Sequence, residues 1–345
     1  MTLVRERRHQ EALRLILPPP TTLPHRAVNP SPLSSSSSSS NSPGIDSLSD
    51  LKKLSVLGRG NGGTVYKVSH KQTGSVYALK VLRFGEDDAA ATREAEILQR
   101  VDSEYIVRCF GVFNGEFPEV DGGGGGGGLC FVMEYMDYGS LHDVLRKKKR
   151  LPEHVISCIV RSVLKGLEYL HGIQVVHRDI KPSNLLVNLR GHVKIADFGV
   201  SWVVNSGGDH TRCTCTDGSC MGTCAYMSPE RLDPERWDGG RCDGFVGDVW
   251  SLGVVAMECY VGRFPLIGPG QKPDWVTLMC AICFGENVES VVKMASPEFE
   301  SFCQRCLERD WRKRRTVEEL LSHPFVTNSE INGVEDLVSY IASSN

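Results

Sequence analysis

Apolar and polar residues alternate in short runs between residues 51 and 134, and turn-forming residues separate the runs. This pattern predicts β-strands at Ser55–Leu57, Thr64–Ser69, Val76–Leu82, Ile106–Asn114 and Leu129–Glu134. A helical pattern lies between the third and fourth strands, around Ala89 to Val101. After Gly139 the periodicity is mostly helical, as in Pro152–His171 and Phe245–Val261. We therefore expect an α+β fold in which a small β-rich lobe precedes a larger helical lobe.

Both ends of the chain differ from this patterned region. Residues 1–50 contain three consecutive prolines from Pro18 and a serine tract from Ser34 to Ser40. Such a composition buries too little apolar surface to offset the entropy of ordering, so we expect a disordered tail. Residues 327–345 are expected to form a short C-terminal tail. The seven glycines Gly122 to Gly128 predict a flexible loop insertion, with ligand binding as the alternative.

Composition narrows the class of protein. The 345 residues are 41% hydrophobic and 23% charged, with a net charge of −3, which is typical of a globular protein and argues against charge-driven nucleic-acid binding. The 13 cysteines in a chain without a secretory signal indicate reduced thiols in the cytoplasm or nucleus. The apolar run Leu13 to Leu17 is too short for a membrane span. A transit peptide within the acid-poor first 45 residues is the alternative.

Two motifs in the β-rich region point to phosphate binding. The segment 58–65 fits G-x-G-x-x-G-x-V, in which glycines let the backbone approach phosphate oxygens. A strand-forming run follows it, whereas a dinucleotide-binding fold would begin a helix there. Lys80 ends an apolar strand 17 residues after Gly63, where it can reach phosphates; a surface lysine is the alternative. Its expected anionic partner is Glu94 on the predicted helix, with Glu96 as the competitor.

The helical region carries the strongest signal, the segment His177-Arg178-Asp179-Ile180-Lys181-Pro182-Ser183-Asn184. Its spacing places Asp179 as a proton acceptor and Asn184 as a metal ligand on one loop, with Lys181 between them to neutralise a transferring phosphate. Thirteen residues later, Asp197 in Asp-Phe-Gly is expected to be the second magnesium ligand. A polar surface turn is the alternative for each segment.

Three further features support the same chemistry. The segment Phe131–Met136 ends a strand and would connect the lobes, where its backbone can bond adenine. Glu230, in Ser-Pro-Glu, is expected to form a structural ion pair with Arg314. Asp248 is expected to brace the loop that carries Asp179.

Together these motifs resemble the eukaryotic protein kinases over residues 51–326. The resemblance implies a two-lobed fold, with an N-lobe at about 51–133, a hinge at 134–138 and a C-lobe at 139–326. It implies ATP and Mg²⁺ as cofactors and catalytic roles for Lys80, Glu94, Asp179 and Lys181. The residues expected to contact ATP are Leu57, Gly58, Gly60, Gly63, Val65, Ala78, Lys80, Met133, Glu134, Met136 and Leu186.

Narrower features resemble the plant MAP kinase kinases, in the short subgroup without an added C-terminal domain. The family features are His-Arg-Asp-Ile-Lys-Pro-Ser-Asn, Asp-Phe-Gly-Val-Ser and the run Gly222–Arg231. The resemblance to the short subgroup is carried by the opening Leu3–Arg8 and the helical segment Leu278–Glu286. The resemblance implies a monomeric enzyme in the cytoplasm and nucleus. It would be activated by an upstream MAP kinase kinase kinase, and would phosphorylate Thr and Tyr in the activation loop of a MAP kinase.

The activation segment departs from this resemblance. Plant members carry two Ser/Thr acceptors with five residues between them, but here the first falls on Cys213 and only the second, Ser219, is an acceptor. Thr214 and Thr216 are nearby candidates out of register. Activation by double phosphorylation is therefore in question, and we expect switching through Ser219 with at most one such threonine.

The N-terminal tail contains a basic cluster followed by alternating apolar residues. By resemblance it is a docking peptide for MAP kinases, with a solvated tail as the alternative. The residues concerned are Arg5, Arg7, Arg8, Leu13 and Leu15.

The cysteine pairs Cys280/Cys283 and Cys303/Cys306 have a spacing that also occurs in four-cysteine zinc sites. Because both pairs fall on predicted helices, we expect packed thiols instead. Redox sensitivity of the cysteines in the activation segment is a weaker hypothesis.

Two other functions stay open at this stage. One is a generic Ser/Thr kinase or an upstream kinase, and the other is a weakly active or non-catalytic scaffold that recruits MAP kinases.

Overall fold

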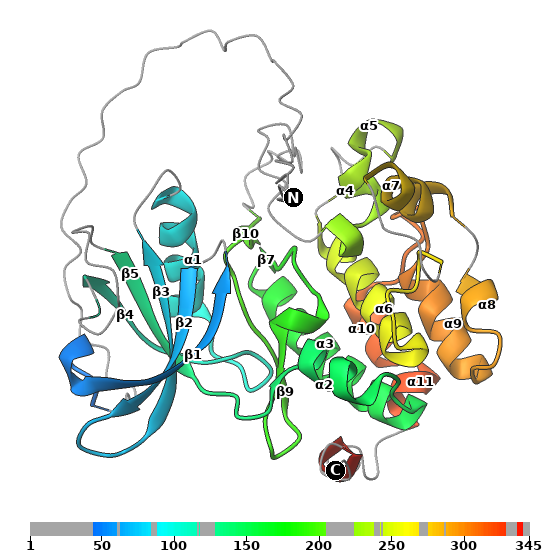
Figure 1. Ribbon diagram of the computed structural model, residues 1–345. Coiled ribbons are helices and arrows are strands. Elements are labelled where there is room, and N and C mark those ends of the chain that lie inside the picture. Colours follow the sequence, from blue (N-terminus) through cyan, green and yellow to red (C-terminus); the bar gives the residue numbers. More distant parts are fainter. Residues whose placement is uncertain are drawn as a thin grey trace, which may run out of the picture. The chain divides into compact units, whose positions relative to one another are not determined.

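The computed structural model describes residues 44–60, 63–83, 88–115, 117, 128–204, 224–237, 242, 244–268, 275–285, 288–328 and 337–340. The first part of this region is a five-stranded antiparallel sheet with one helix, and the second part is mostly helical (Figure 1). The predicted α+β architecture is confirmed. No helix of the described residues is long and apolar enough to cross a membrane.

The main sheet has the strand order β1-β2-β3-β5-β4. A short 3-10 helix, η1 (Leu48–Asp50), precedes it. Every second residue of the later part of β2 is buried, as expected of a strand with one covered face. The elements of this region are β1 (Leu51–Gly60), β2 (Gly63–His70), β3 (Val76–Arg83), α1 (Asp88–Arg100), β4 (Cys109–Gly115) and β5 (Gly128–Glu134).

Strand β5 is covered on both faces. Cys130 and Val132 belong to one hydrophobic cluster, which also contains Tyr66 and Leu79. Phe131 and Met133 point to the other face, where they join Leu98 of α1 in the larger hydrophobic core. This core continues into the helical region, so α1 and the sheet are packed against the elements that carry the catalytic motifs.

The two longest helices of the described residues, α3 and α6, form the centre of the second region. α6 is buried at every position from Asp248 to Met257, which explains why its sequence is apolar on all sides. At Gly253 an added Cβ would lie 2.6 Å from Cys306 Cβ, so this glycine permits the close approach of α6 and α9. The helices are α2 (Leu141–Lys148), α3 (Glu153–Gly172), α4 (Pro229–Leu232), α5 (Pro234–Trp237), α6 (Phe245–Val261), α7 (Trp275–Phe284), α8 (Val288–Val291), α9 (Pro297–Cys306), α10 (Val317–Leu321) and α11 (Pro324–Thr327).

Two small sheets of short strands flank the loops that carry the catalytic motifs. One small sheet has the order β6-β8-β9, and a second pairs β10 with β7. The elements are β6 (Gly139–Ser140), β7 (Val175–Val176), the 3-10 helix η2 (Pro182–Asn184), β8 (Leu185–Val187), β9 (Val193–Ile195), β10 (Trp202–Val203) and the 3-10 helix η4 (Cys224–Tyr226).

The strand predicted at Ile106–Asn114 begins later than expected, at Cys109. Ile106 instead forms a parallel bridge with Ile195, and the Val107 N–H donates to the Ile195 carbonyl at 2.9 Å. The backbone of this segment is therefore bonded to β9 in the second region before it enters the sheet.

Candidate active site

Lys80 on β3 joins the two regions through ion pairs. Its Nζ lies 2.6 Å from Glu94 Oε1 and 2.8 Å from Asp197 Oδ1. Of the two carboxylates considered for this role, Glu94 is buried and bonded to Lys80, whereas Glu96 is exposed on the same helix. Lys80 is 7% exposed, so the alternative of a surface lysine is excluded.

The environment keeps Lys80 charged. Burial alone would lower the pKa of Lys80, but the charges of Asp197 and Glu94 and their hydrogen bonds outweigh it and raise the pKa. For Asp197, burial would raise the pKa, whereas the Lys80 charge and hydrogen bond lower it. The Asp197 side chain is 46% exposed, against 2% for Glu94. Asp197 is thus accessible to a ligand, whereas Glu94 is buried against Lys80.

The loop after β7 gathers the second set of charged groups. Lys181 Nζ lies 2.7 Å from Asp179 Oδ2. Asn184 Nδ2 donates to the Asp179 carbonyl at 3.0 Å and to its carboxylate at 2.9 Å. This assignment leaves Oδ1 as the Asn184 atom that suits a metal, with Ser183 Oγ 3.4 Å away. The three predicted residues of this loop therefore form one connected cluster.

Backbone bonds connect this loop to the segment that carries Asp197. The Ala196 N–H donates to the Asn184 carbonyl at 2.8 Å, and His177 Nε2 lies 3.2 Å from the Ala196 carbonyl. Asp197 has φ +68°, a left-handed conformation that is costly for a residue with a side chain. Both bonds belong to Ala196, so they fix the backbone directly before Asp197, whose carboxylate lies 2.8 Å from Lys80 Nζ.

Asp248 on α6 supports the catalytic loop from below. Its carboxylate accepts the N–H of His177 at 2.9 Å and of Arg178 at 2.7 Å, and it bonds to His171 at 3.0 Å. Burial would raise the pKa of Asp248, but these contacts outweigh it and lower the pKa. The predicted bracing by Asp248 is confirmed. The bond to His171 was not predicted, because nothing in the spacing of the sequence links that histidine to α6.

The glycine-rich turn between β1 and β2 lies beside Lys80, since Val65 is paired with Lys80 across β2 and β3. Gly63 has φ +99°, and an added Cβ would clash with the Val81 carbonyl, so this glycine is required by the fold. Gly58 and Gly60 differ, because an added Cβ would meet nothing within 4 Å. The open space above these two glycines fits a loop that a phosphate approaches closely.

The remaining residues expected to contact ATP differ in how far they are buried. Met133 and Met136 are buried, Leu57 is exposed, and the others are partly buried, namely Val65, Ala78 and Leu186. At the hinge, the Glu134 N–H donates to the Arg108 carbonyl at 2.8 Å, and the Glu134 side chain pairs with Lys194 at 2.8 Å. The N–H and the side chain of Glu134 are thus both bonded within the protein.

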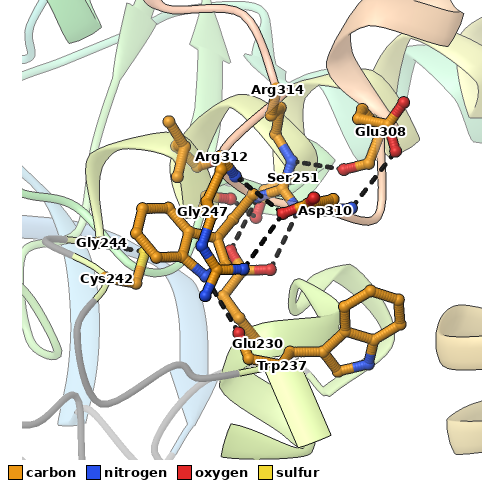
Figure 2. A network of polar contacts seen from close by, with 12 residues as sticks. Glu230, Trp237, Cys242, Gly244, Gly247, Ser251, Glu308, Asp310, Arg312 and Arg314 are labelled. Carbon is orange, nitrogen blue, oxygen red and sulfur yellow. Dashed lines mark hydrogen bonds and ion pairs between the residues drawn. The ribbon is translucent and has the colours of Figure 1, made fainter.

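The expected ion pair between Glu230 and Arg314 is confirmed. Arg314 Nη1 lies 2.7 Å from Glu230 Oε1 and Nη2 lies 2.9 Å from Oε2. Figure 2 shows this pair in a network that includes the backbone of Glu308, which accepts from Arg314 Nε at 2.9 Å. Both side chains are buried, and Arg314 also lies over the Trp250 ring at 5.1 Å. The pair connects Glu230, which follows the activation segment, to Arg314 near the end of the helical region.

This arrangement can transfer a phosphoryl group. A buried lysine is held by one carboxylate, an accessible carboxylate and an amide oxygen are available for a metal, and a second carboxylate lies beside a lysine. Residues 51–326 match the family model described as protein kinase domain. The chain is 53% identical to Mitogen-activated protein kinase kinase 10 of Arabidopsis thaliana over 328 residues, which is 95% of this chain and 100% of that protein.

The chain belongs to the mitogen-activated protein kinase kinases, within the protein kinase family. It is also 47% identical to Mitogen-activated protein kinase kinase 9 of Arabidopsis thaliana, over 94% of this chain and 99% of that protein. With Mitogen-activated protein kinase kinase 1c of Physcomitrium patens it shares 38% identity, over 87% of this chain and 84% of the moss protein. The predicted resemblance to plant members of this family is confirmed.

Protein kinases use ATP and Mg²⁺, and the residues of this kinase fit both. Magnesium takes hard oxygen ligands, keeps several waters and is shared with substrate phosphates, so Asn184 and Asp197 suffice as protein ligands. Lys80 would contact phosphates from β3, in the cross-strand row that also contains Val65 and the open glycine Gly58.

Several predicted residues lie outside the described part of this kinase. These are the phosphorylation candidates Ser219, Thr214 and Thr216, the neighbouring Cys213, and the docking residues Arg5, Arg7, Arg8, Leu13 and Leu15. Among the described residues, no cluster of three or more His, Cys, Asp or Glu side chains is placed to hold a metal. Cys283, Cys303 and Cys306 are buried on α7 and α9, whereas Cys280 is exposed.

Proposed function

We propose that this kinase is an ATP- and Mg²⁺-dependent enzyme that phosphorylates Thr and Tyr in the activation loop of a MAP kinase. The observation that carries the proposal is the pair of bonds from Lys80 to Glu94 and Asp197. These bonds bring together one residue from the sheet, one from α1 and one from the second region. Asn184, which is bonded to Asp179, connects this group to the catalytic loop through the bond of its carbonyl with the Ala196 N–H.

Each residue has a distinct chemical task in this proposal. Lys80, kept charged by its two carboxylates, orients the phosphates of the nucleotide. Asp179 accepts the proton of the substrate hydroxyl, and Lys181 at 2.7 Å stabilises the charge that develops beside it. Asn184 and Asp197 would hold Mg²⁺, which neutralises phosphate charge when it is bound. ATP would lie under the glycine-rich turn and against the hinge at Met133, Glu134 and Met136.

The proposal extends to partners, regulation and location, and the family and the sequence support it. The kinase would receive its signal from an upstream MAP kinase kinase kinase and act as a monomer in the cytoplasm and nucleus. The tail with Arg5, Arg7 and Arg8 would dock on an acidic surface of the MAP kinase, and Leu13 and Leu15 would fill apolar pockets. Phosphorylation at Ser219 would order the activation segment, with at most one of Thr214 and Thr216 contributing.

The test is a phosphorylation assay of the purified full chain against a panel of folded MAP kinases. Phosphopeptide mapping should find phosphate on both Thr and Tyr of the substrate activation loop. The Asp179→Asn variant is the matched control, because it removes the proton acceptor and keeps a side chain of the same size. Phosphate on loose peptides but on no folded MAP kinase would favour the generic Ser/Thr kinase.

The scaffold alternative makes an opposite prediction. A scaffold would bind a MAP kinase with similar affinity in the wild type and in Asp179→Asn, and neither would transfer phosphate. The connected geometry at Lys80 and Asp179 favours the enzyme.

A further inference from the structure

The side chain of Trp202, on β10, contacts two arginines that come from different parts of the chain. The Cζ atom of Arg93 lies 4.7 Å from the centre of the Trp202 ring, and that of Arg178 lies 5.2 Å from it. A guanidinium within about 6 Å of an aromatic centre is attracted by the ring quadrupole, and tryptophan gives the strongest such contact. One indole thus forms cation–π contacts with both arginines.

Each arginine adjoins a residue of the proposed active site. Arg93 is on α1 directly before Glu94, the partner of Lys80. Arg178 is directly before Asp179, and its backbone has φ +69°, a conformation that neighbouring contacts must hold. The position of the Trp202 ring is therefore coupled to the helix that holds Lys80 and to the loop that holds Asp179.

The backbone of Trp202 is fixed on the side of the catalytic loop. Trp202 is paired with Val176 in the two-stranded sheet of β10 and β7. On one side of it the Ser201 hydroxyl donates to the His177 carbonyl at 3.1 Å, and on the other the Val204 N–H donates to the Gln174 carbonyl at 2.8 Å. With its backbone anchored in this way, the indole reaches α1 through Arg93, and a shift of the helix would change that contact.

We propose that Trp202 is a positioning residue that couples helix α1 to the catalytic loop through its contacts with Arg93 and Arg178. The two guanidinium groups carry like charges and repel each other. The indole of Trp202 attracts both of them and has no titratable group of its own. The turnover measurements in the test below rest on the proposed function, whereas the hydrogen-exchange measurements do not.

The test compares Trp202→Ala and Trp202→Phe with wild type in the full chain. Because the contacts set the placement of Glu94 and Asp179 rather than substrate binding, Trp202→Ala should lower kcat about tenfold and leave the KM for ATP within about twofold. Trp202→Phe keeps an aromatic face and should recover most of the rate. Hydrogen exchange should rise in α1 of Trp202→Ala and stay unchanged in α9.

Two matched controls separate positioning from general loss of structure. Val203→Ala truncates the next residue of the same strand pair, and Arg100→Ala removes an exposed positive charge from the same helix as Arg93. Neither should change kcat or exchange in α1. An effect of Val203→Ala as large as that of Trp202→Ala would overturn the proposal, since it would show that only the strand pair matters.

A double-variant cycle tests the contact itself. If Arg93 acts through Trp202, Arg93→Ala combined with Trp202→Ala should lose no more activity and show no more exchange than Trp202→Ala alone. Additive losses would overturn the proposal. If the wild type transfers phosphate to no MAP kinase, the proposed function fails, whereas hydrogen exchange in the four proteins of the cycle still decides the role of Trp202.

Discussion

Arg314 meets Glu230 in a two-point ion pair that spans 84 positions of the chain, with N–O distances of 2.7 and 2.9 Å. The Arg314 side chain is fully buried and the Glu230 side chain is 3% exposed. A charge in such a place depends on its partner, because water cannot replace the lost interaction.

The Glu230→Gln variant should therefore destabilise the kinase strongly. It leaves the Arg314 charge buried without a counter-charge, and we expect a loss of about 3–5 kcal/mol in the free energy of unfolding. Urea unfolding followed by circular dichroism measures this loss. The matched control is Glu319→Gln, which removes an exposed partner of Arg315 at 2.6 Å and should cost about 1 kcal/mol or less. Equal losses in the two variants would contradict the argument.

Asp248→Asn tests the support of the catalytic loop. An amide accepts hydrogen bonds more weakly than a carboxylate and turns an NH₂ group toward donors, so stability at pH 7 should fall by about 2–3 kcal/mol. Turnover should fall as well, because the N–H groups of His177 and Arg178 lose their acceptor. Asp137→Asn is the control, since that exposed carboxylate accepts only the N–H of Leu189 among the bonds described here.

Asp248 also gives a pH dependence with a definite sign. Its pKa is lower in the folded protein than in the unfolded chain, so the unfolded chain binds more protons as the solution becomes acidic. The stabilisation is complete above the unfolded pKa of about 4 and is lost as the pH falls through the lower folded pKa. Unfolding free energies measured from pH 6 to 3 should decline less steeply in Asp248→Asn than in wild type. A slope as steep in the variant would show that other carboxylates dominate.

Lys80→Arg should nearly abolish turnover although the charge is retained. A planar guanidinium is bulkier than an ammonium and cannot lie 2.6 Å from Glu94 and 2.8 Å from Asp197 in the space that Nζ occupies. We expect a loss of about a hundredfold or more in kcat, by analogy with the removal of one preorganised charge contact. Lys52→Arg, on the exposed part of β1, should be as active as wild type.

The sequence was sufficient to predict the lobes, because β2 and α3 show strand and helix periodicity and because β5 and α6 are continuous apolar runs of strand and helix length. It also predicted that Asp179 and Asn184 lie on one loop, and the structure shows that Asn184 is bonded to Asp179 there. The ion pairs of Lys80 with Glu94 and of Glu230 with Arg314 were predicted as well, because each of these residues lies in a motif or a predicted helix that the sequence shows.

Other contacts had no sequence signal. The stacking of Trp202 on Arg93 and Arg178 depends on where β10 is paired, which two residues of strand do not reveal. The late start of β4 arises because Ile106 is bridged to Ile195, 89 positions away. Tertiary pairing decides such details, and local periodicity does not encode them.

Asp179→Asn and Asp197→Asn should fail in different ways. Asp179 belongs to the cluster with Lys181 and Asn184, whereas the accessible Asp197 is the expected metal ligand. Asp179→Asn should lower kcat by about a hundredfold or more and leave the Mg²⁺ concentration for half-maximal rate unchanged. Asp197→Asn should lower the rate and raise that concentration. A Mg²⁺ titration of both variants at fixed ATP checks this, and the same Mg²⁺ dependence in both would contradict the division of roles.

If the cysteines of α7 and α9 are packed thiols, the reactivity of each should follow its burial. Cysteines that bind zinc would be protected whether they are buried or exposed. Burial raises the pKa of Cys303 and Cys306 well above the usual range, and it raises the pKa of Cys130 to about 11. Iodoacetamide at pH 8, read by peptide mass spectrometry, should label the exposed Cys280 in the native kinase and the three buried cysteines only after denaturation. Zinc bound in equal molar amount, with Cys280 protected until a chelator is added, would show instead that Cys280 and its neighbour Cys283 are metal ligands.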